Sequence, residues 1–379
     1  MNKEKQLFYN TMRNLFAGQK VTDDYSEYKE RLTKIAIANK CFTLFYECAK
    51  QVNIVFGADM KSVMLQTVTH SYKNLTVQNN IIAHLQEHGI PCAVLKGASV
   101  AARYPEPILR SLGDIDLLVP QEDYEKSIDL LLNGKERDKL HSMHKFHYLL
   151  HIDGIPVEIH NAVAHFSEQD AQLKDYMRLA LTQCKTDRID DFTFPVLSER
   201  FQVLSLLLHT KTHYFENQLT GRMLLDWAVV ADSISDTEWN DTIYPILEKL
   251  DLHKWADAMN AVCHRYLCPS LENKIHTSFD EDTTSQLADV FISDACRDGA
   301  SEQKGRRLKN IISWVNEIAR RDFSLTGRKK YLSPLFWPII FIRYLYRLKI
   351  GYRKKVDIFK YSDSYHVKET LYRKIQESA

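Results

Sequence analysis

Most of the chain shows the hydrophobic pattern of amphipathic helices. Apolar residues recur at intervals of three and four in residues 28–52 and 60–85, and no proline occurs before Pro91. Such spacing places the apolar side chains on one helical face. From about residue 166 onward the chain is again expected to be helical, and the clearest patterns lie at 198–215, 221–232, 239–268, 281–297 and 303–321.

Between the two helical regions, short apolar runs and alternating residues predict strands. We therefore expect an α+β fold, in which a small mixed sheet is flanked by helical regions. Gly89 ends the first helical region, as glycine commonly does. The expected parts are an N-terminal helical region at 1–88, a core at 89–165, a C-terminal helical domain at 166–325 and a basic aromatic segment at 326–379.

The first strand of the core leads into a glycine turn. Residues 92–95 form a short apolar run, Lys96-Gly97-Ala98 follows, and residues 100–102 open a short helix. A glycine between a strand and a helix lets backbone N–H groups approach an anion, and the adjacent lysine supplies a charge for phosphate. Since many such turns contain glycine and an exposed lysine without binding anything, a purely structural interpretation stays open.

Two aspartates interrupt the next apolar stretch, residues 109–120. Asp114 and Asp116 stand two positions apart and alternate with Ile115 and Leu117. Successive side chains of a strand point to opposite faces, so the two carboxylates share one face. Like charges this close repel each other and lose hydration, which is tolerable where a hard divalent cation neutralises them. The alternative is a solvated edge strand with incidental acids.

A hairpin is predicted after an amphipathic helix at 121–132. The dipeptide Asp153-Gly154 is favoured in two-residue turns, and it lies between alternating segments at 145–152 and 155–160. The apolar positions of both segments then fall on one face, which must pack against helices.

The same turn sets which residues face each other across the hairpin. It places Leu149 opposite Glu158, and His147 opposite His160, on the polar face. Glu158 is therefore the third carboxylate expected beside the two aspartates.

Histidines crowd this region, and a transition-metal site must be considered. Their spacing suits no common closed zinc motif. Alternation along the strands alone explains why three of them share the polar face. His160, two positions past Glu158, is the histidine expected near the substrate. The six are His141, His144, His147, His151, His160 and His165.

Two later helices carry polar pairs at one-turn spacing. His209 and His213 share a face of the first, and Arg222 and Asp226 share a face of the second. The segment at 209–213, His-Thr-Lys-Thr-His, lacks the glutamate that a zinc-protease helix needs in its second position. Two interpretations stay open: the pairs line a cleft, or they pack between helices with Arg222 and Asp226 as an intrahelical ion pair.

Charge and cysteine content narrow the class of protein. The 379 residues include 50 Lys plus Arg against 49 Asp plus Glu, a balance that argues against a generic nucleic-acid binder. The seven cysteines are scattered and mostly embedded in apolar segments, as in reduced proteins. The first residues contain no apolar stretch typical of a secretory signal. A cytoplasmic location is expected.

The C-terminal segment differs from the rest of the chain. Residues 328–356 include nine Lys or Arg and no acid, interleaved with aromatic residues. The apolar run at 335–342 is broken by Pro338 and is too short to span a bilayer. Such a segment can lie peripherally on a membrane or meet another anionic partner. Alternatively, its aromatics pack on the domain and its arginines stay solvated.

Taken together, these motifs resemble the DNA polymerase beta-like nucleotidyltransferase superfamily, and within it a bacterial family often found near polysaccharide genes. The core likeness covers about 90–165. Its features are Val-Leu-Lys-Gly-Ala at 94–98, Tyr-Pro-Glu-Pro at 104–107, Arg110, Gly-Asp-Ile-Asp-Leu-Leu-Val at 113–119, Val-Glu-Ile-His at 157–160, His209, His213 and Leu-Asp-Trp-Ala at 225–228.

The resemblance implies transfer of a nucleoside monophosphate from a nucleoside triphosphate such as ATP to an unidentified acceptor, with release of pyrophosphate. Asp114, Asp116 and Glu158 would hold Mg²⁺ or Mn²⁺ and act as the catalytic residues. In one departure, Lys96-Gly97-Ala98 stands where the superfamily usually has Gly-Ser or Gly-Gly. The nucleotide would contact Lys96, Gly97, Ala98, Arg110, His160, His209, His213 and Arg222.

Two other functions stay open. A glycosyltransferase also binds a metal and a nucleotide sugar through Asp-x-Asp, but it needs an extended α/β region before the motif, where this chain has helices. A non-catalytic nucleotide-binding scaffold would be favoured if Glu158 lay away from the aspartates.

Overall fold

The computed structural model describes residues 1–16, 20–134, 136, 147–163, 171–296, 307–323, 325, 327–349 and 358–378. His141, His144 and His165 lie outside these residues, as do positions 145–146 of the predicted hairpin, 303–306 of the last predicted helix and 350–356 of the basic segment.

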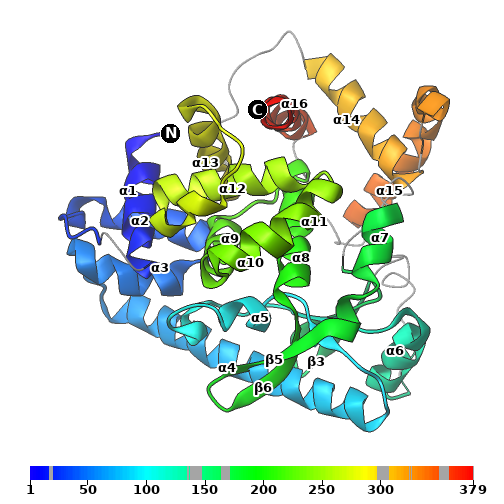
Figure 1. The fold of residues 1–379 in the computed structure, drawn as a ribbon, viewed down its shortest axis with the longest axis horizontal. Helices are drawn as coiled ribbons and strands as arrows, with labels where there is room; N and C mark the ends of the chain where they lie inside the picture. Colours follow the sequence, from blue (N-terminus) through cyan, green and yellow to red (C-terminus); the bar gives the residue numbers. More distant parts are fainter. Residues whose placement is uncertain are drawn as a thin grey trace.

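The N-terminal region is helical, as predicted. The pattern at 28–52 forms two helices that meet at a turn, where Lys40 has a positive φ of 57°. The pattern at 60–85 forms one long helix, which runs beneath the sheet in Figure 1. The bounds are α1 (Lys3–Met12), α2 (Lys29–Ala38), α3 (Phe42–Ala49) and α4 (Ala58–Glu87).

A mixed six-stranded sheet with the order β3-β4-β2-β1-β6-β5 forms the core of the fold. β1 pairs antiparallel with β2 and parallel with β6, and β2 pairs parallel with β4. With its helical flanks, the sheet confirms the α+β fold. The strands are β1 (Ala93–Val94), β2 (Ile115–Leu118), β3 (His147–Ile152), β4 (Ile155–His160), β5 (Cys184–Ile189) and β6 (Phe192–Leu197).

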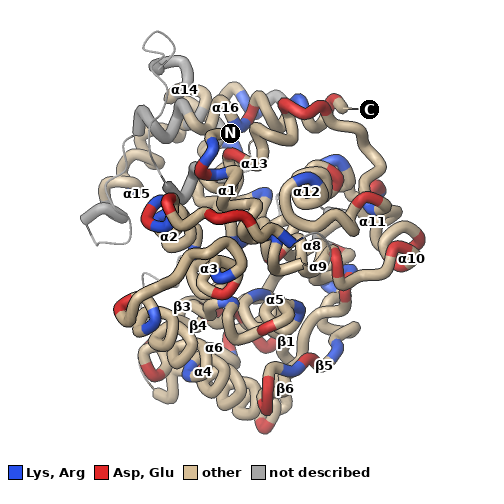
Figure 2. The backbone as a smooth tube through the Cα atoms, turned by 90° about the vertical axis from the view of Figure 1, so that its left-hand side faces the viewer, with Lys and Arg blue, Asp and Glu red and all other residues tan. Residues whose placement is uncertain are grey.

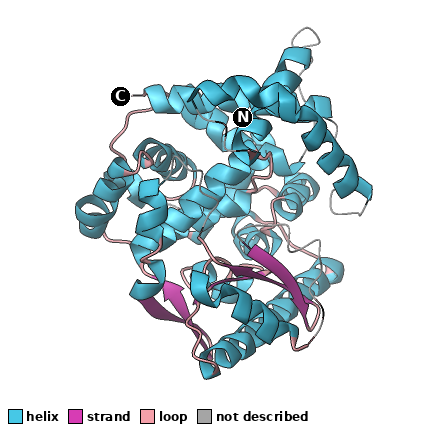
Figure 3. Ribbon diagram, turned by 90° about the vertical axis from the view of Figure 1, so that its right-hand side faces the viewer, coloured by secondary structure: helices cyan, strands magenta, loops and turns pink. Residues whose placement is uncertain are grey.

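The two faces of the sheet pack on different helices. One face buries Ile115, Leu117 and Val157 against apolar side chains of α4 and of α6 (Tyr124–Leu132). The opposite side contributes Leu95 and Leu118 to a second core, formed largely by the N-terminal and C-terminal helices. Figure 3 shows the strands gathered in one part of the molecule, with helices over the rest. The polar residues of β2 and β4 alternate with the first set of apolar residues and so face away from α4.

The expectation of helices alone after residue 166 is wrong at 184–197. These residues form the antiparallel hairpin of β5 and β6, and β6 joins the sheet beside β1. The sheet therefore takes strands from both sides of residue 166, where we placed a boundary. β5 is an edge strand with mostly exposed side chains, so it shows little hydrophobic pattern.

The remaining helices surround a second core that contains three fully buried tryptophans, Trp227, Trp239 and Trp255. α16 returns to pack on α8, α12 and α14. The bounds are α5 (Ala98–Ala101), α7 (Ala171–Met177), α8 (Glu199–Phe215), α9 (Gly221–Ser233), α10 (Asp236–Glu238), α11 (Tyr244–Lys249), α12 (His253–Tyr266), α13 (Glu281–Cys296), α14 (Arg307–Asp322), α15 (Trp337–Lys349) and α16 (Ile358–Glu377).

The distribution of charged residues and the burial of most cysteines agree with what the sequence predicts. Acidic and basic residues are interspersed along the chain in Figure 2. Cys41, Cys48, Cys92, Cys263 and Cys268 are buried free thiols, and Cys184 is exposed and also free. In the part of the chain that the structure describes, no helix is both long enough and apolar enough to cross a membrane.

Candidate active site

The predicted hairpin register is confirmed and brings the polar residues together. Asp153 and Gly154 both adopt positive φ, 49° and 77°, as a two-residue turn of this kind requires. Across the hairpin, His147 lies opposite His160. In the neighbouring parallel pair, Asp116 lies opposite Glu158. The acidic strand and the Val-Glu-Ile-His strand therefore present their polar side chains on the same face.

Asp116 is the centre of this group, and its side chain is buried at 3% exposure. Its Oδ1 accepts hydrogen bonds from Lys96 Nζ at 3.0 Å and His160 Nε2 at 2.9 Å. The same His160 nitrogen lies 3.3 Å from Glu158 Oε2. One imidazole nitrogen thus contacts both carboxylates, so Asp116 and Glu158 face a common space. We call Asp114, Asp116, Glu158 and His160 the carboxylate site.

The charges of this group depend on one another. Burial alone would raise the pKa of Asp116, but the Lys96 charge and the His160 hydrogen bond hold it well below its usual range. Burial alone would lower the pKa of His160, but its hydrogen bonds to Asp116 and Glu158 raise it. Lys96 likewise has a raised pKa, because the carboxylates outweigh its desolvation. The buried carboxylate is therefore ionised, and Lys96 and His160 stabilise its charge.

Asp114 behaves differently from Asp116. It stands just before β2, and its side chain is exposed. Repulsion from Asp116, followed by desolvation, raises the pKa of Asp114, and Lys96 only partly offsets this. Asp114 is therefore a carboxylate with excess negative charge around it, which is the condition that favours a bound cation.

The glycine turn holds Lys96 against the carboxylate site. The backbone N–H of Leu95 donates to the Asp116 carbonyl at 3.0 Å, which fixes the end of β1 beside β2. Gly97 then adopts a φ of 61°, a conformation that favours glycine. Because the Ala98 side chain is buried, only its backbone can contribute to nucleotide binding.

α8 supplies the predicted histidine pair. The rings of His209 and His213 lie 4.3 Å apart, edge to face. Burial, followed by the nearby Lys96 charge, lowers the pKa of His213 to about 4 and that of His209 well below its ordinary value. The charges of Lys96 and Asp116 act on both rings, so the rings lie near the carboxylate site. Both imidazoles are neutral at physiological pH.

The turn between α2 and α3 docks on the start of α9. The Asn39 carboxamide oxygen accepts from the Gly221 N–H at 2.6 Å, and the Asn39 carbonyl accepts from the Arg222 N–H at 3.3 Å. A Cβ on Gly221 would lie 3.2 Å from the same Asn39 oxygen, so this junction needs a small residue. It places Lys40, the next residue of the turn, near Arg222.

Lys40 and Arg222 are cations beside Asp114. Desolvation, then mutual repulsion with Arg222, lowers the pKa of Lys40, while Asp114 acts in the opposite direction. Arg222 Nη1 donates to the Ser111 carbonyl at 3.2 Å, and its buried Nε has no hydrogen-bond partner among the described residues. Lys40 was not among the predicted site residues, because a single lysine in a helix-connecting turn carries no signal in the sequence.

Arg110, unlike Arg222, forms an ion pair with Asp226. Its Nε and Nη2 donate to the two carboxylate oxygens of Asp226 at 2.9 and 2.6 Å, and the Tyr104 hydroxyl donates to the same group at 2.9 Å. Among the described residues, Asp226 therefore pairs with Arg110 and not with Arg222, so the intrahelical ion pair is not formed. Arg110 is only 4% exposed, and its predicted contact with the nucleotide stays a prediction.

Two groups of residues could hold a metal ion. Asp114, Asp116 and Glu158 would suit a hard cation such as Mg²⁺, but their oxygens do not form a group within 4.8 Å of one another among the described residues. In addition, one potential ligand atom from each of His147, Glu158 and His160 lies within 4.8 Å of the others. Imidazole nitrogens suit transition metals, so this second set would favour Mn²⁺ or a similar ion over Mg²⁺.

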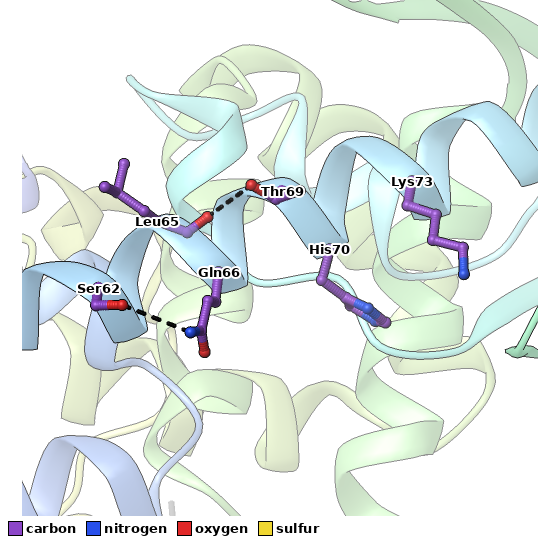
Figure 4. A pocket seen from close by; sticks show the side chains of 6 residues that line it. All are labelled: Ser62, Leu65, Gln66, Thr69, His70 and Lys73. Atoms are coloured by element: carbon purple, nitrogen blue, oxygen red, sulfur yellow. Dashed lines mark hydrogen bonds between the residues drawn. The ribbon is translucent and has the colours of Figure 1, made fainter.

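A shallow pocket elsewhere is unrelated to these residues. It lies along the exposed side of α4 (Figure 4). All of its lining residues come from that one helix, at intervals of one turn. Among the described residues, no other element contributes a charged or polar group to the lining. The lining residues are Ser62, Leu65, Gln66, Thr69, His70 and Lys73.

Comparison with known proteins agrees with this geometry. A family model described as an uncharacterised nucleotidyltransferase matches residues 26–267. The chain belongs to this nucleotidyltransferase family. The match includes α2 and α3, so the helices that carry Lys40 are part of the nucleotidyltransferase unit. Neither the search of curated proteins nor that of solved structures found a match.

Proposed function

We propose that this nucleotidyltransferase is metal-dependent and transfers a nucleoside monophosphate from a nucleoside triphosphate to a hydroxyl or phosphate acceptor. The α-phosphorus forms a bond to the acceptor oxygen, its bond to the bridging oxygen of the β-phosphate breaks, and pyrophosphate leaves. The observation that carries the proposal is the register of β2 and β4, which sets Asp116 opposite Glu158 with Asp114 two residues before Asp116.

The donor set fits a hard divalent cation. Asp114, Asp116 and Glu158 would hold Mg²⁺ or Mn²⁺, and both contacts to Asp116 use Oδ1, which leaves Oδ2 for the ion. When bound, the metal would neutralise the triphosphate and lower the pKa of the acceptor hydroxyl. Glu158, whose pKa the His160 hydrogen bond lowers despite burial, stays ionised and can accept the hydroxyl proton.

The surrounding residues have complementary roles in this proposal. Lys96, Lys40 and Arg222 balance phosphate charge that the metal does not cover. His209 and His213, which are neutral, can donate or accept single hydrogen bonds and help to exclude water from the activated phosphorus. Arg110 acts as a positioning residue, because its bidentate contact with Asp226 fixes α9, and with it Arg222, against the strand of the aspartates.

The proposal also covers the acceptor, the nucleotide and the location of the protein in the cell. The family resemblance favours an acceptor from polysaccharide biosynthesis and ATP as the first triphosphate to test. The free cysteines support a cytoplasmic location.

The direct test is incubation of the protein with each labelled triphosphate, Mg²⁺ or Mn²⁺, and cell extract. We expect a labelled product and released pyrophosphate with the wild type, and loss of both with Asp114→Asn and Glu158→Gln. Glu122→Gln, a change at an exposed acid, is the matched control. Product formation that persists in both site variants would contradict the proposal.

A non-catalytic nucleotide-binding scaffold is the second candidate. It is favoured by the contacts of Lys96 and His160 with Asp116, which already neutralise the carboxylate. Metal-dependent triphosphate binding without any pyrophosphate release, under all the acceptor conditions above, would identify this function.

A further inference from the structure

The C-terminal part of the chain forms a helical hairpin beyond the matched family region. α14 is followed by the 3-10 segment η11 (Gly327–Phe336) and by α15. The Phe323 and Phe336 rings stack at 4.2 Å, and Trp337 Nε1 donates to Asn316 Oδ1 at 2.9 Å. These contacts fix which side of η11 and α15 faces α14. In Figures 1 and 2, α14 and α15 lie at the edge of the molecule.

The other side of this hairpin exposes large apolar side chains. Leu335, Phe341 and Ile342 are 71%, 57% and 64% exposed. Of the sixteen exposed large hydrophobic residues described in the protein, seven fall between positions 331 and 345, so they are concentrated in η11 and α15 and are not scattered over the chain. We call them the 331–345 surface: Tyr331, Leu332, Leu335, Ile339, Phe341, Ile342 and Leu345.

The spacing of these residues is that of one helical side. Within α15, Ile339, Ile342 and Leu345 follow each other at intervals of three, and Leu335 precedes them at the end of η11. An amphipathic helix whose apolar side packs on its own domain would bury these positions. Here Phe336 and Trp337, which are half-buried, make the described side-chain contacts of the hairpin instead.

Positive charge is concentrated in the same stretch of the sequence. Residues 328–356 hold nine Lys or Arg and no acid, whereas the rest of the chain holds 41 Lys or Arg against 49 acids. Lys329 and Lys330 are exposed, and neither has an acidic partner among the described residues. The segment is thus a positive region on a chain that is otherwise net negative, and this difference would orient it toward an anionic surface.

We propose that the 331–345 surface docks on an anionic lipid membrane. Its aromatic and aliphatic side chains would enter the interface between headgroups and acyl chains, while Lys329 and Lys330 would meet lipid phosphates. An acidic protein could satisfy the lysines but would need its own apolar patch to cover the rest. This inference concerns only binding and is independent of the proposed nucleotidyl transfer.

The test uses the full-length protein and sucrose-loaded vesicles of phosphatidylcholine, with or without phosphatidylglycerol. We expect pelleting with the anionic vesicles, weakened by added salt, and little with the neutral ones. Lys329→Gln combined with Lys330→Gln should lower the partition coefficient about thirtyfold. Leu335→Ser combined with Ile342→Ser should lower it at least about tenfold.

Val55→Ser combined with Leu65→Ser is the matched control, because these residues are 77% and 52% exposed but lie in the N-terminal region. The control should bind like the wild type, and melting curves should show that all variants fold. Equal pelleting with both vesicle types, no pelleting at all, or equal loss in the control would overturn the proposal. A folded protein that pellets with neither type of vesicle would instead point to an acidic protein partner.

Discussion

Single side chains of the carboxylate site differ in what they contribute to stability. Asp114 and Asp116 are only two residues apart, yet Asp116 accepts hydrogen bonds from Lys96 and His160, whereas the pKa of Asp114 is raised first by Asp116 itself. A like-charge pair in the sequence suggests that removing either acid relieves repulsion. The contacts restrict this expectation to Asp114, because loss of Asp116 leaves Lys96 and His160 without their buried counter-charge.

We therefore expect opposite effects from two matched substitutions. Asp114→Asn should leave the free energy of unfolding unchanged or slightly higher in the absence of metal. Asp116→Asn should lower it by about 3 kcal/mol, as breaking a buried ion pair does. Urea unfolding in the presence of a chelator measures both. Similar destabilisation by the two variants would show that the Asp116 contacts do not carry the difference.

His160 gives the site a pH-dependent contribution to stability. Its pKa is raised in the folded protein by Asp116 and Glu158, which outweigh its desolvation. Such a group stabilises the fold fully below its unfolded pKa, about 6.5, and the contribution is lost as pH rises through the folded pKa. His160→Gln should thus be more destabilising at pH 6 than at pH 9, as melting curves with chelator would show. His70→Gln, at an exposed histidine of α4, is the matched control.

At the scale of elements, the strength of local signals explains what the sequence predicts. The β3–β4 register follows from Asp153-Gly154 and strict alternation, and both are local. The β5–β6 hairpin was missed because its turn begins at Asp190 without a glycine, and its second strand contains Pro195. The contact of Arg110 with Asp226 spans 116 positions, so no sequence periodicity can indicate it.

That contact should hold α9 in place. Arg110→Met should lower the free energy of unfolding by about 3–5 kcal/mol, because it leaves the Asp226 carboxylate buried without its counter-charge. The double variant Arg110→Met with Asp226→Leu should recover part of the loss, since both charges are then removed together. Chemical unfolding of the two variants distinguishes these outcomes. A double variant less stable than either single change would argue that the pair is not the source of the effect.

At the scale of the whole molecule, the candidate site is assembled from three distant parts of the chain. The carboxylates lie on the sheet, the histidines on α8, and Lys40 with Arg222 at the junction of α2 and α9. The carboxylates were predicted from strand alternation, and the histidine pair and Arg222 from one-turn spacing on helices. Lys40 and its junction with α9 needed the tertiary structure.

Lys40 provides the sharpest test of this assembly. It is exposed in the turn after α2, so Lys40→Ala should hardly change the melting temperature. If it contacts the triphosphate, the same change should weaken metal-dependent ATP binding about tenfold, as loss of a charged hydrogen bond does. Isothermal titration calorimetry measures the affinity, with Lys34→Ala on α2 as the control. Unchanged affinity in Lys40→Ala would limit the site to the sheet and α8.

The Arg110–Asp226 pair also constrains the order in which the protein can mature during synthesis. Arg110 emerges from the ribosome 116 residues before the carboxylate that neutralises it. Until Asp226 is available, burying Arg110 is unfavourable, so the segment that leads into the aspartate strand stays open. A nascent chain that ends before α9 would therefore contain all three carboxylates and still lack a finished site. Completion of the site therefore depends on translation of α9, the helix that carries Asp226 and Arg222.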